Sequence, residues 1–179
     1  MTATPVSTPA PYCILVAALG GEGGGVLADW LVQCALESGL PVQATSVPGV
    51  AQRTGATSYY IELLRAAVPA GAAQPVFALT PLPGCVDVVV ASELLEAARM
   101  VERGFVTGRT TLIASTHRVY TTIEKMHMAD GRQDPQRLQG AAQALARRAV
   151  LFDMEAVTVQ SGAVVSAVMF GALAGAGVL

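Results

Sequence analysis

The stretch Ile14-Leu-Val-Ala-Ala-Leu-Gly-Gly-Glu-Gly-Gly-Gly-Val-Leu-Ala-Asp-Trp30 decides the fold of this chain. An apolar run passes through five glycines in six positions and enters a pattern of helical spacing, which predicts a strand, a turn and a helix. Glycine lets the backbone adopt positive φ and lets a ligand or another segment approach closely. The first N–H groups of the helix would point at whatever lies beside the turn. The loop therefore has two interpretations: it contacts a phosphate-bearing ligand, or it serves packing or a subunit contact.

The spacing of this glycine loop departs from the known nucleotide signatures. It contains a G-x-x-G-x-G-like pattern rather than G-x-G-x-x-G, and no P-loop ending of Gly-Lys-Ser/Thr follows it. Glu22 would repel a phosphate unless its side chain points away. Thr45 and Ser46 stand where a ribose-binding acid would end the second strand. An independent domain that binds NAD, FAD or CoA is therefore an alternative rather than the first interpretation.

Strand and helix patterns alternate along the rest of the chain. Apolar and β-branched runs predict strands at 12–19, 42–47, 57–64, 76–79, 86–90, 110–115 and 150–152. Helical spacing predicts helices at 26–38, from a Ser92 cap to 103, at 121–128, at 136–148 and in the C-terminal segment. We therefore expect one Rossmann-like, three-layer α/β/α domain over residues 12–179, with a mostly parallel sheet, after a disordered tail of residues 1–11.

The composition favours a subunit of a larger assembly. Of the 179 residues, 53% are hydrophobic and 13% are charged, which is unusually apolar for a free-standing domain. The net charge of −2 and the scattered basic residues argue against nucleic-acid binding. Cys13, Cys34 and Cys85 lie far apart, without the spacing of a zinc or iron–sulfur motif. We expect reduced core thiols in a cytoplasmic protein, because no signal peptide precedes them.

The last 24 residues, 156–179, carry no charge and are long enough to span a membrane. They contain Gln160, two serines, a threonine and four glycines, and no basic flank follows them. We therefore expect a buried helix and no membrane contact. The sequence stops in mid-pattern at Gly177-Val-Leu179, so we expect it to be part of a longer protein.

A second loop, Ser46-Val-Pro-Gly-Val-Ala-Gln-Arg-Thr-Gly55, lies between two predicted strands. Arg53 carries a planar, fixed charge suited to a phosphate or carboxylate, although an ordinary salt bridge explains it equally well. We assign binding rather than catalysis to the two loops, and no metal ligand. The candidate cofactor-binding residues are Gly20, Gly21, Gly23, Gly24, Gly25, Gly49, Gln52, Arg53, Thr54 and Gly55.

Three further polar residues have structural interpretations. His117 follows a predicted strand, and we expect it to pack or hydrogen-bond, since no residue at a defined spacing marks a catalytic partner. Asp87 and Glu93 flank a strand end, and we expect them at a helix start rather than as an acid and base pair.

Taken together, these segments resemble the gamma-type domain of 2-oxoacid:ferredoxin oxidoreductases, and more narrowly the beta subunit of indolepyruvate ferredoxin oxidoreductase. The family form of the first motif is G-x-G-G-Q-G-V, in which Glu22 here replaces a glycine and Gly24 the glutamine. The second motif, usually ending Arg-Gly-Gly, has Thr54 after its arginine. Both departures resemble the long variant of the beta subunit. The segments that carry the resemblance are 20–27, 47–55, 86–91 with Glu93, 111–117 and 166–173.

The resemblance implies a complex that decarboxylates an aryl 2-oxo acid on thiamine diphosphate, passes electrons through iron–sulfur clusters to ferredoxin, and releases an acyl-CoA. In this family those cofactors belong to the large alpha subunit. The resemblance therefore implies a non-catalytic chain in a hetero-oligomer, inactive alone, with CoA as its possible ligand. A pure assembly module, whose glycines pack against a partner, is a further alternative.

Overall fold

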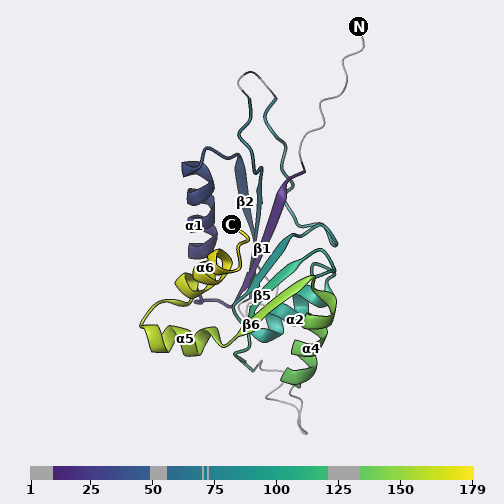
Figure 1. Ribbon diagram of the computed structural model, residues 1–179, viewed down its shortest axis with the longest axis vertical. Coiled ribbons are helices and arrows are strands. Elements are labelled where there is room, and N and C mark those ends of the chain that lie inside the picture. The colour runs from purple at the N-terminus through teal and green to yellow at the C-terminus, as the bar shows by residue number, and fades with distance from the viewer. Residues whose placement is uncertain (1–9, 49–55, 70, 72, 121–133) are drawn as a thin grey trace.

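The computed structural model describes residues 10–48, 56–69, 71, 73–120 and 134–179. Residues 1–9 of the expected tail 1–11, and the expected helix 121–128, lie outside these residues. Figure 1 shows strands gathered in one central sheet with helices on either side. In chain order the elements are β1 (Tyr12–Ala18), α1 (Gly24–Glu37), β2 (Val42–Pro48), β3 (Thr57–Leu63), β4 (Val88–Ala91), α2 (Leu94–Glu102), β5 (Thr111–Ser115), α4 (Pro135–Leu145), β6 (Arg148–Phe152), α5 (Met154–Ser161) and α6 (Val165–Gly175).

The sheet has the strand order β2-β3-β1-β4-β5-β6. Strands β1, β4, β5 and β6 pair in parallel, whereas β3 is antiparallel to both β1 and β2. This mostly parallel sheet confirms the predicted α/β class. The antiparallel β3 follows from the short connection before it, because a parallel partner would need a crossover of a dozen or more residues.

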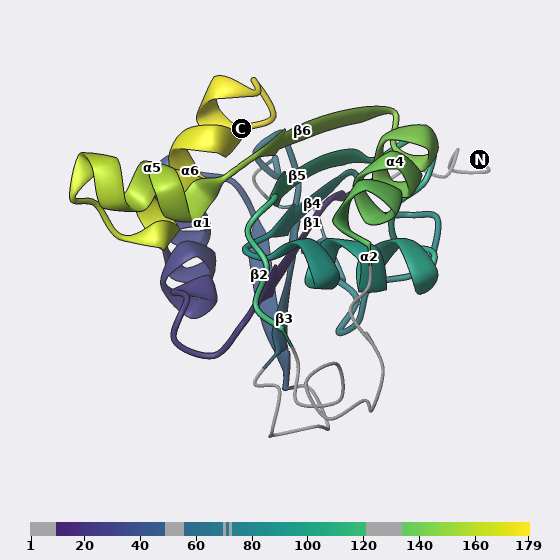
Figure 2. The ribbon, with the colours of Figure 1, turned by 90° about the horizontal axis from the view of Figure 1, so that it is seen from below.

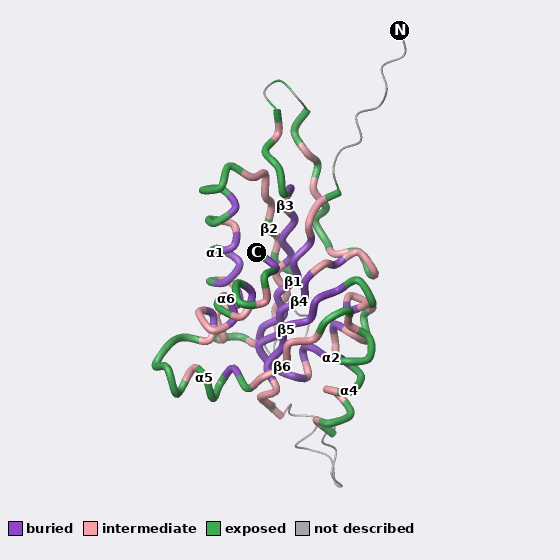
Figure 3. Tube along the Cα trace, in the orientation of Figure 1, coloured by how far each residue is buried: buried purple, intermediate pink, exposed green. Residues whose placement is uncertain are grey.

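Helices cover both faces of the sheet, as Figure 2 shows from below. Helices α1 and α6 lie on one face, with α5 beside α6, and helices α2 and α4 lie on the other. Side chains alternate between the two faces along β1: Leu15 packs with Ala97 and Met100 of α2, while Ile14 packs with Leu31 of α1. The buried residues form the centre of the molecule in Figure 3. Three layers, each apolar where it meets the next, give the fold its core.

One predicted strand, Val76–Leu79, is wrong. This segment lies against the sheet without joining it, held by side chains of β2 and β3. Gln43 and Thr45 donate to the carbonyls of Ala78 and Leu79, at 3.1 and 2.8 Å, and a carboxylate oxygen of Glu62 accepts from the N–H of Ala78 at 2.7 Å. In a strand, these carbonyl and N–H groups would pair with the backbone of a neighbouring strand; here side chains satisfy them instead.

The C-terminal segment forms two helices rather than one. Gly162, at φ 66°, ends α5, and α6 leaves at an angle of 111° to it. Helix α6 buries Ser166, Met169 and Leu173, but α5 buries only Met154, so the expected burial is wrong for α5. Among the described residues no single helix is long and apolar enough to cross a membrane. The bent pair of α5 and α6 reaches the required length and apolar composition only when both helices are taken together.

Candidate functional site

The glycine loop lies at the carboxyl ends of the parallel strands. It follows Ala18 at the end of β1 and leads into α1 on one face of the sheet, whereas the neighbouring strand β4 leads into α2 on the other face. Open α/β sheets bind ligands at such a point, where successive connections diverge to opposite faces. The loop therefore lies where this architecture places a binding site.

The inner glycines of the loop pack against the chain itself. A Cβ added to Gly24 would lie 2.6 Å from the Cβ of Ala18 and 2.9 Å from Cε2 of Tyr59. A Cβ on Gly23, whose φ is 69°, would lie 3.0 Å from the Cβ of Ser166, and one on Gly25 would lie 3.3 Å from the Tyr59 hydroxyl. Glycine is therefore needed here for the close approach of α1 to β3 and α6, whatever else the loop does.

The outer part of the loop is open. Gly20 and Gly21 are exposed, and no heavy atom lies within 4 Å of a Cβ built on Gly21, whose φ is 89°. Helix α1 starts at Gly24 with no side-chain cap and no acidic residue in its first turn. The positive end of the helix dipole therefore lies beside an exposed stretch of glycine backbone, an arrangement that suits an anionic group.

Glu22 points back into the molecule. Its Oε2 accepts hydrogen bonds from the Ser92 hydroxyl and, at 3.3 Å, from the N–H of Leu19. Ser92 directly follows β4, and its N–H donates to the carbonyl of Ala17 at 3.0 Å. The carboxylate is thus bound at the ends of β1 and β4, which is the orientation that an anion site at this loop requires.

Ser92 is not the cap of α2, contrary to the prediction. Glu93 is the N-cap, and its carboxylate accepts from the N–H groups of Leu95 and Glu96. The predicted helix-start role of Glu93 is therefore confirmed. That of Asp87 is wrong, because Asp87 precedes β4 and pairs with Arg109 at 2.7 Å and with the N–H of Cys13 at 2.9 Å.

Glu93 also holds the segment that follows β5. Its second carboxylate oxygen accepts from the N–H of Val119 at 3.0 Å and lies 3.5 Å from a guanidinium nitrogen of Arg118. Burial raises the pKa of Glu93, which is only 1% exposed, while the Val119 N–H and the charge of Arg118 act in the opposite direction. The buried carboxylate of Glu93 therefore connects the start of α2, which follows β4, to the segment that follows β5.

His117 lies in this segment and is held through its backbone. Its N–H donates to the Ser115 hydroxyl at 3.1 Å, and its carbonyl accepts from the N–H of Leu94 at 3.1 Å. The Ser115 hydroxyl also accepts from the N–H of Met154 at 3.1 Å, so it links β5 to the start of α5. These contacts of His117 involve its backbone alone, so the packing or hydrogen-bonding role expected of its side chain stays a prediction.

The second predicted loop leaves the sheet beside the first. Register pairs Pro48 with Thr57, and Thr57 with Ala18, so the connection from β2 to β3 starts and ends at the strand edge that carries the glycine loop. The candidate residues Gly49, Gln52, Arg53, Thr54 and Gly55 themselves lie outside the described residues. The described strand ends therefore bring the two candidate loops to neighbouring positions.

Sequence reasoning missed Tyr59 and the link between Glu22 and Ser92. The contact of Tyr59 with the loop depends on the antiparallel register of β3, for which periodicity gives no signal. Ser166 had one indication, since it begins the segment 166–173, which carries part of the family resemblance. The described residues contain no group of three or more His, Cys, Asp or Glu side chains that could hold a metal ion.

Comparison with solved structures gives relatives of the same fold at low sequence identity. A pyruvate oxidoreductase subunit from Thermotoga maritima matches with a TM-score of 0.59 and 15% identity, over 96% of this chain and 79% of that one. A 2-oxoglutarate:ferredoxin oxidoreductase from Magnetococcus marinus, solved with 2-oxoglutarate, coenzyme A and succinyl-CoA bound, matches with a TM-score of 0.56 and 14% identity. That match covers 93% of this chain but only 24% of the Magnetococcus chain, so the same fold is there one part of a longer polypeptide.

A third structure, the gamma subunit of a keto/oxoacid ferredoxin oxidoreductase from Geobacter sulfurreducens, matches with a TM-score of 0.50 and 13% identity, over 86% of this chain and 69% of that one. No curated protein sequence matches the chain. The family profile described as pyruvate ferredoxin/flavodoxin oxidoreductase matches residues 13–179, which include both candidate loops and every described strand except the first residue of β1. This chain belongs to the pyruvate ferredoxin/flavodoxin oxidoreductase family.

Proposed function

We propose that this chain is a non-catalytic subunit of a cytoplasmic 2-oxoacid:ferredoxin oxidoreductase that acts on aryl 2-oxo acids such as indolepyruvate. The observation that carries the proposal is the family match over residues 13–179. The aryl specificity rests on the resemblance of the glycine loop and of residues 47–55 to the long beta subunit of indolepyruvate ferredoxin oxidoreductase. The chemistry then takes place on the thiamine diphosphate and iron–sulfur clusters of a large partner subunit.

The glycine loop, residues 20–25, and the neighbouring connection from β2 to β3 together form what we call the strand-edge site. This site fits a role in binding CoA. CoA carries a pyrophosphate, and the exposed backbone of Gly20 and Gly21 beside the uncapped start of α1 suits such an anion. The carboxylate of Glu22 does not oppose it, since it is bound to Ser92 and Leu19 on the inner side of the loop. Arg53 would add a fixed positive charge from the neighbouring loop. When bound, CoA would accept the acyl group that the partner's chemistry releases.

The experiment is reconstitution with the partner. The chain is produced together with a thiamine-binding large subunit encoded beside it, and ferredoxin reduction is measured with CoA and, separately, indolepyruvate, pyruvate and 2-oxoglutarate. We expect activity only when both subunits are present, with the highest kcat/KM for indolepyruvate. A preference for pyruvate would refute the aryl specificity, and activity of the large subunit alone at the same rate would refute the subunit role.

The role of Arg53 is tested in the same complex. Arg53→Met should raise the KM for CoA about tenfold, the value of one charge-assisted hydrogen bond. It should leave the KM for the 2-oxo acid unchanged. Arg148→Met is the matched control, because Arg148 is an exposed arginine on β6 that donates to the carbonyl of Ala176, outside the strand-edge site. An equal effect of both variants would argue against CoA binding at these loops.

A second candidate function is assembly alone, because the packing of the inner glycines within the chain explains their presence without a ligand. In that case Gly23→Ala and Gly25→Ala would weaken association with the large subunit but leave the CoA affinity of the assembled complex unchanged. A third alternative is an independent nucleotide-binding domain. Calorimetry of the lone chain with NAD, NADP, FAD and CoA distinguishes it from the two subunit roles, because only an independent domain is expected to bind a dinucleotide tightly.

A further inference from the structure

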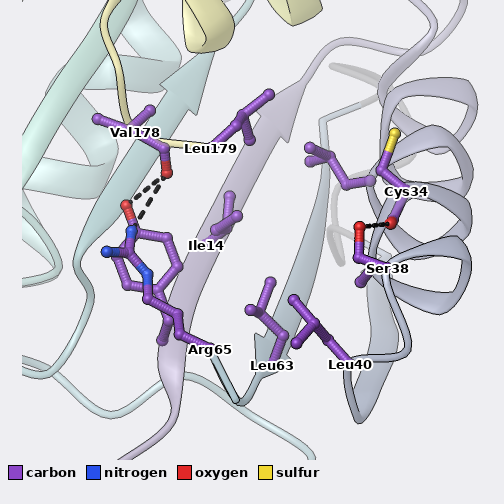
Figure 4. Close-up of a pocket in the computed structure, with 11 residues that line it drawn as sticks. Ile14, Cys34, Ser38, Leu40, Leu63, Arg65, Val178 and Leu179 are labelled. Carbon is purple, nitrogen blue, oxygen red and sulfur yellow. Dashed lines mark hydrogen bonds between the residues drawn. The ribbon is translucent and has the colours of Figure 1, made fainter. Parts of the chain in front are cut away.

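A pocket of about 360 Å³ lies at the end of the strands opposite the glycine loop. Its floor comes from the start of β1 and the end of β3, and one wall comes from the C-terminal half of α1. Residues Val178 and Leu179 close the other side, as Figure 4 shows. The pocket is therefore separate from the two candidate loops and has no part in the function proposed above.

The body of the pocket is aliphatic. Ile14 and Leu63 of the sheet lie at its base in Figure 4, with Leu40 beside them. Leu31 and Ala35 line it from α1 and are 4% and 6% exposed. Surfaces of this kind favour an apolar group, and the volume lies within the range of roughly 300–1,000 Å³ that small-molecule pockets occupy.

One edge of the pocket carries an oriented positive charge. The guanidinium of Arg65 stacks 3.6 Å from the centre of the Tyr12 ring, and one of its nitrogens donates to the carbonyl of Val178 at 3.4 Å. The Tyr12 hydroxyl donates to the same carbonyl at 2.8 Å. Within the described part of the chain, no carboxylate lies within 4.0 Å of Arg65. Arg65 is exposed, but these two contacts orient its guanidinium, which keeps donors for a ligand at the edge of an apolar space.

We propose that this pocket binds a small monocarboxylic acid with an apolar body, whose carboxylate pairs with Arg65 and whose body lies on Ile14, Leu31 and Leu63. The chemistry discriminates against other classes. A neutral apolar molecule would gain no charge-assisted hydrogen bond from Arg65. A second negative charge, as in a dicarboxylate or a nucleotide, would be buried against the aliphatic walls without a partner.

The probe is octanoate, with octanamide as its uncharged counterpart of the same shape. Cys34 is exposed on the α1 wall of the pocket and Cys85 lies outside it, so alkylation by iodoacetamide reports occupancy of the pocket at one thiol with an internal control at the other. In the full-length chain we expect saturating octanoate to slow alkylation of Cys34 at least fivefold and to leave Cys85 unchanged. No protection of Cys34, or equal protection by octanamide, would overturn the proposal.

Two variants test the assigned contacts. Arg65→Met should raise the octanoate concentration for half-protection about tenfold, as expected for one charge-assisted hydrogen bond. The matched control Arg148→Met, an arginine that likewise donates to a backbone carbonyl near the end of α6 but lies outside the pocket, should not change it. Ala35→Leu places additional methyl groups in the pocket at a helical position and should abolish protection. Unchanged half-protection in both Arg65→Met and Ala35→Leu, with folding verified by circular dichroism, would exclude this binding site.

Discussion

The hydroxyl of Ser92, at the end of β4, donates to the carboxylate of Glu22 in the glycine loop. The two residues are 70 positions apart in sequence, and the N–H of Leu19 donates to both side chains at 3.3 Å. This three-way contact fixes the loop to the neighbouring strand and keeps a negative charge off its outer surface. It is therefore the contact on which both the stability and the proposed anion site of the loop depend.

Ser92→Ala should lower the free energy of unfolding by about 1–3 kcal/mol, because it leaves the half-buried carboxylate of Glu22 without one of its donors. The measurement is urea denaturation followed by circular dichroism. Ser38→Ala is the control: its hydroxyl also donates to an oxygen, the carbonyl of Cys34, but it is exposed, so a change within about 0.5 kcal/mol is expected. Equal losses in the two variants would contradict a specific role for the contact with Glu22.

Gly24→Ala should lower the free energy of unfolding by about 1–3 kcal/mol, because its new Cβ would lie 2.6 Å from that of Ala18 and force α1 away from the sheet. Gly140 offers a matched control within helix α4, since no heavy atom lies within 4 Å of its Cβ position. Gly140→Ala should stabilise the protein by about 0.5–1 kcal/mol through helix propensity. If Gly24→Ala were also stabilising, the packing explanation of the inner glycines would be wrong.

Glu93 should make stability depend on pH. Burial raises its pKa in the folded protein, so its protonated form is favoured there relative to the unfolded chain. Its contribution to stability is therefore fully present below its unfolded pKa of about 4.3 and is lost as pH rises through the higher folded pKa. In urea denaturation at a series of pH values, wild type should lose stability relative to Glu93→Gln as pH rises above the unfolded pKa of about 4.3. A difference that grows in favour of wild type with pH would contradict the raised pKa.

Cys13 should resist alkylation in the folded protein. Burial raises the pKa of its thiol to about 11, and the side chain is 5% exposed between Tyr60 and Glu62. Because the thiolate is the reactive form, iodoacetamide at about pH 8 should modify Cys34 first and Cys13 only after denaturation, as peptide mass spectrometry would show. Rapid modification of Cys13 in the native state would indicate that this part of the sheet opens.

Much of the fold could be predicted from local patterns. The apolar run before the glycines predicted β1, and the spacing of Leu27 and Leu31 predicted α1, because both signals come from residues that face one core. The alternation within β3 does not give its direction, since a buried strand has the same alternation either way, and only the short connection from β2 indicates antiparallel pairing. The segment Val76–Leu79 has strand-forming residues, but side chains of distant strands bind its backbone instead.

The site was predictable only in part, for a related reason. The glycines marked the loop, but the partners that occupy its inner side, Tyr59, Ser92 and Ser166, come from three separate elements. Ser92 is the better N-cap by residue type, but its hydroxyl donates to Glu22, and Glu93 takes the cap position instead. Whether the candidate residues bind a ligand stays a prediction, to be tested by the Arg53 experiment.

The antiparallel strand β3 also bears on how the sheet forms. Strands β2 and β3 are adjacent in the chain and pair with each other, whereas β1 reaches β4 only across the whole of that hairpin and the segment after it. Closing a short loop costs less entropy than closing a long one, so local pairs form faster than distant ones. We expect the β2–β3 hairpin to be present early in folding as a template, with β1 completing the sheet by inserting between the hairpin and the parallel half, and with the glycine loop among the last segments to become ordered.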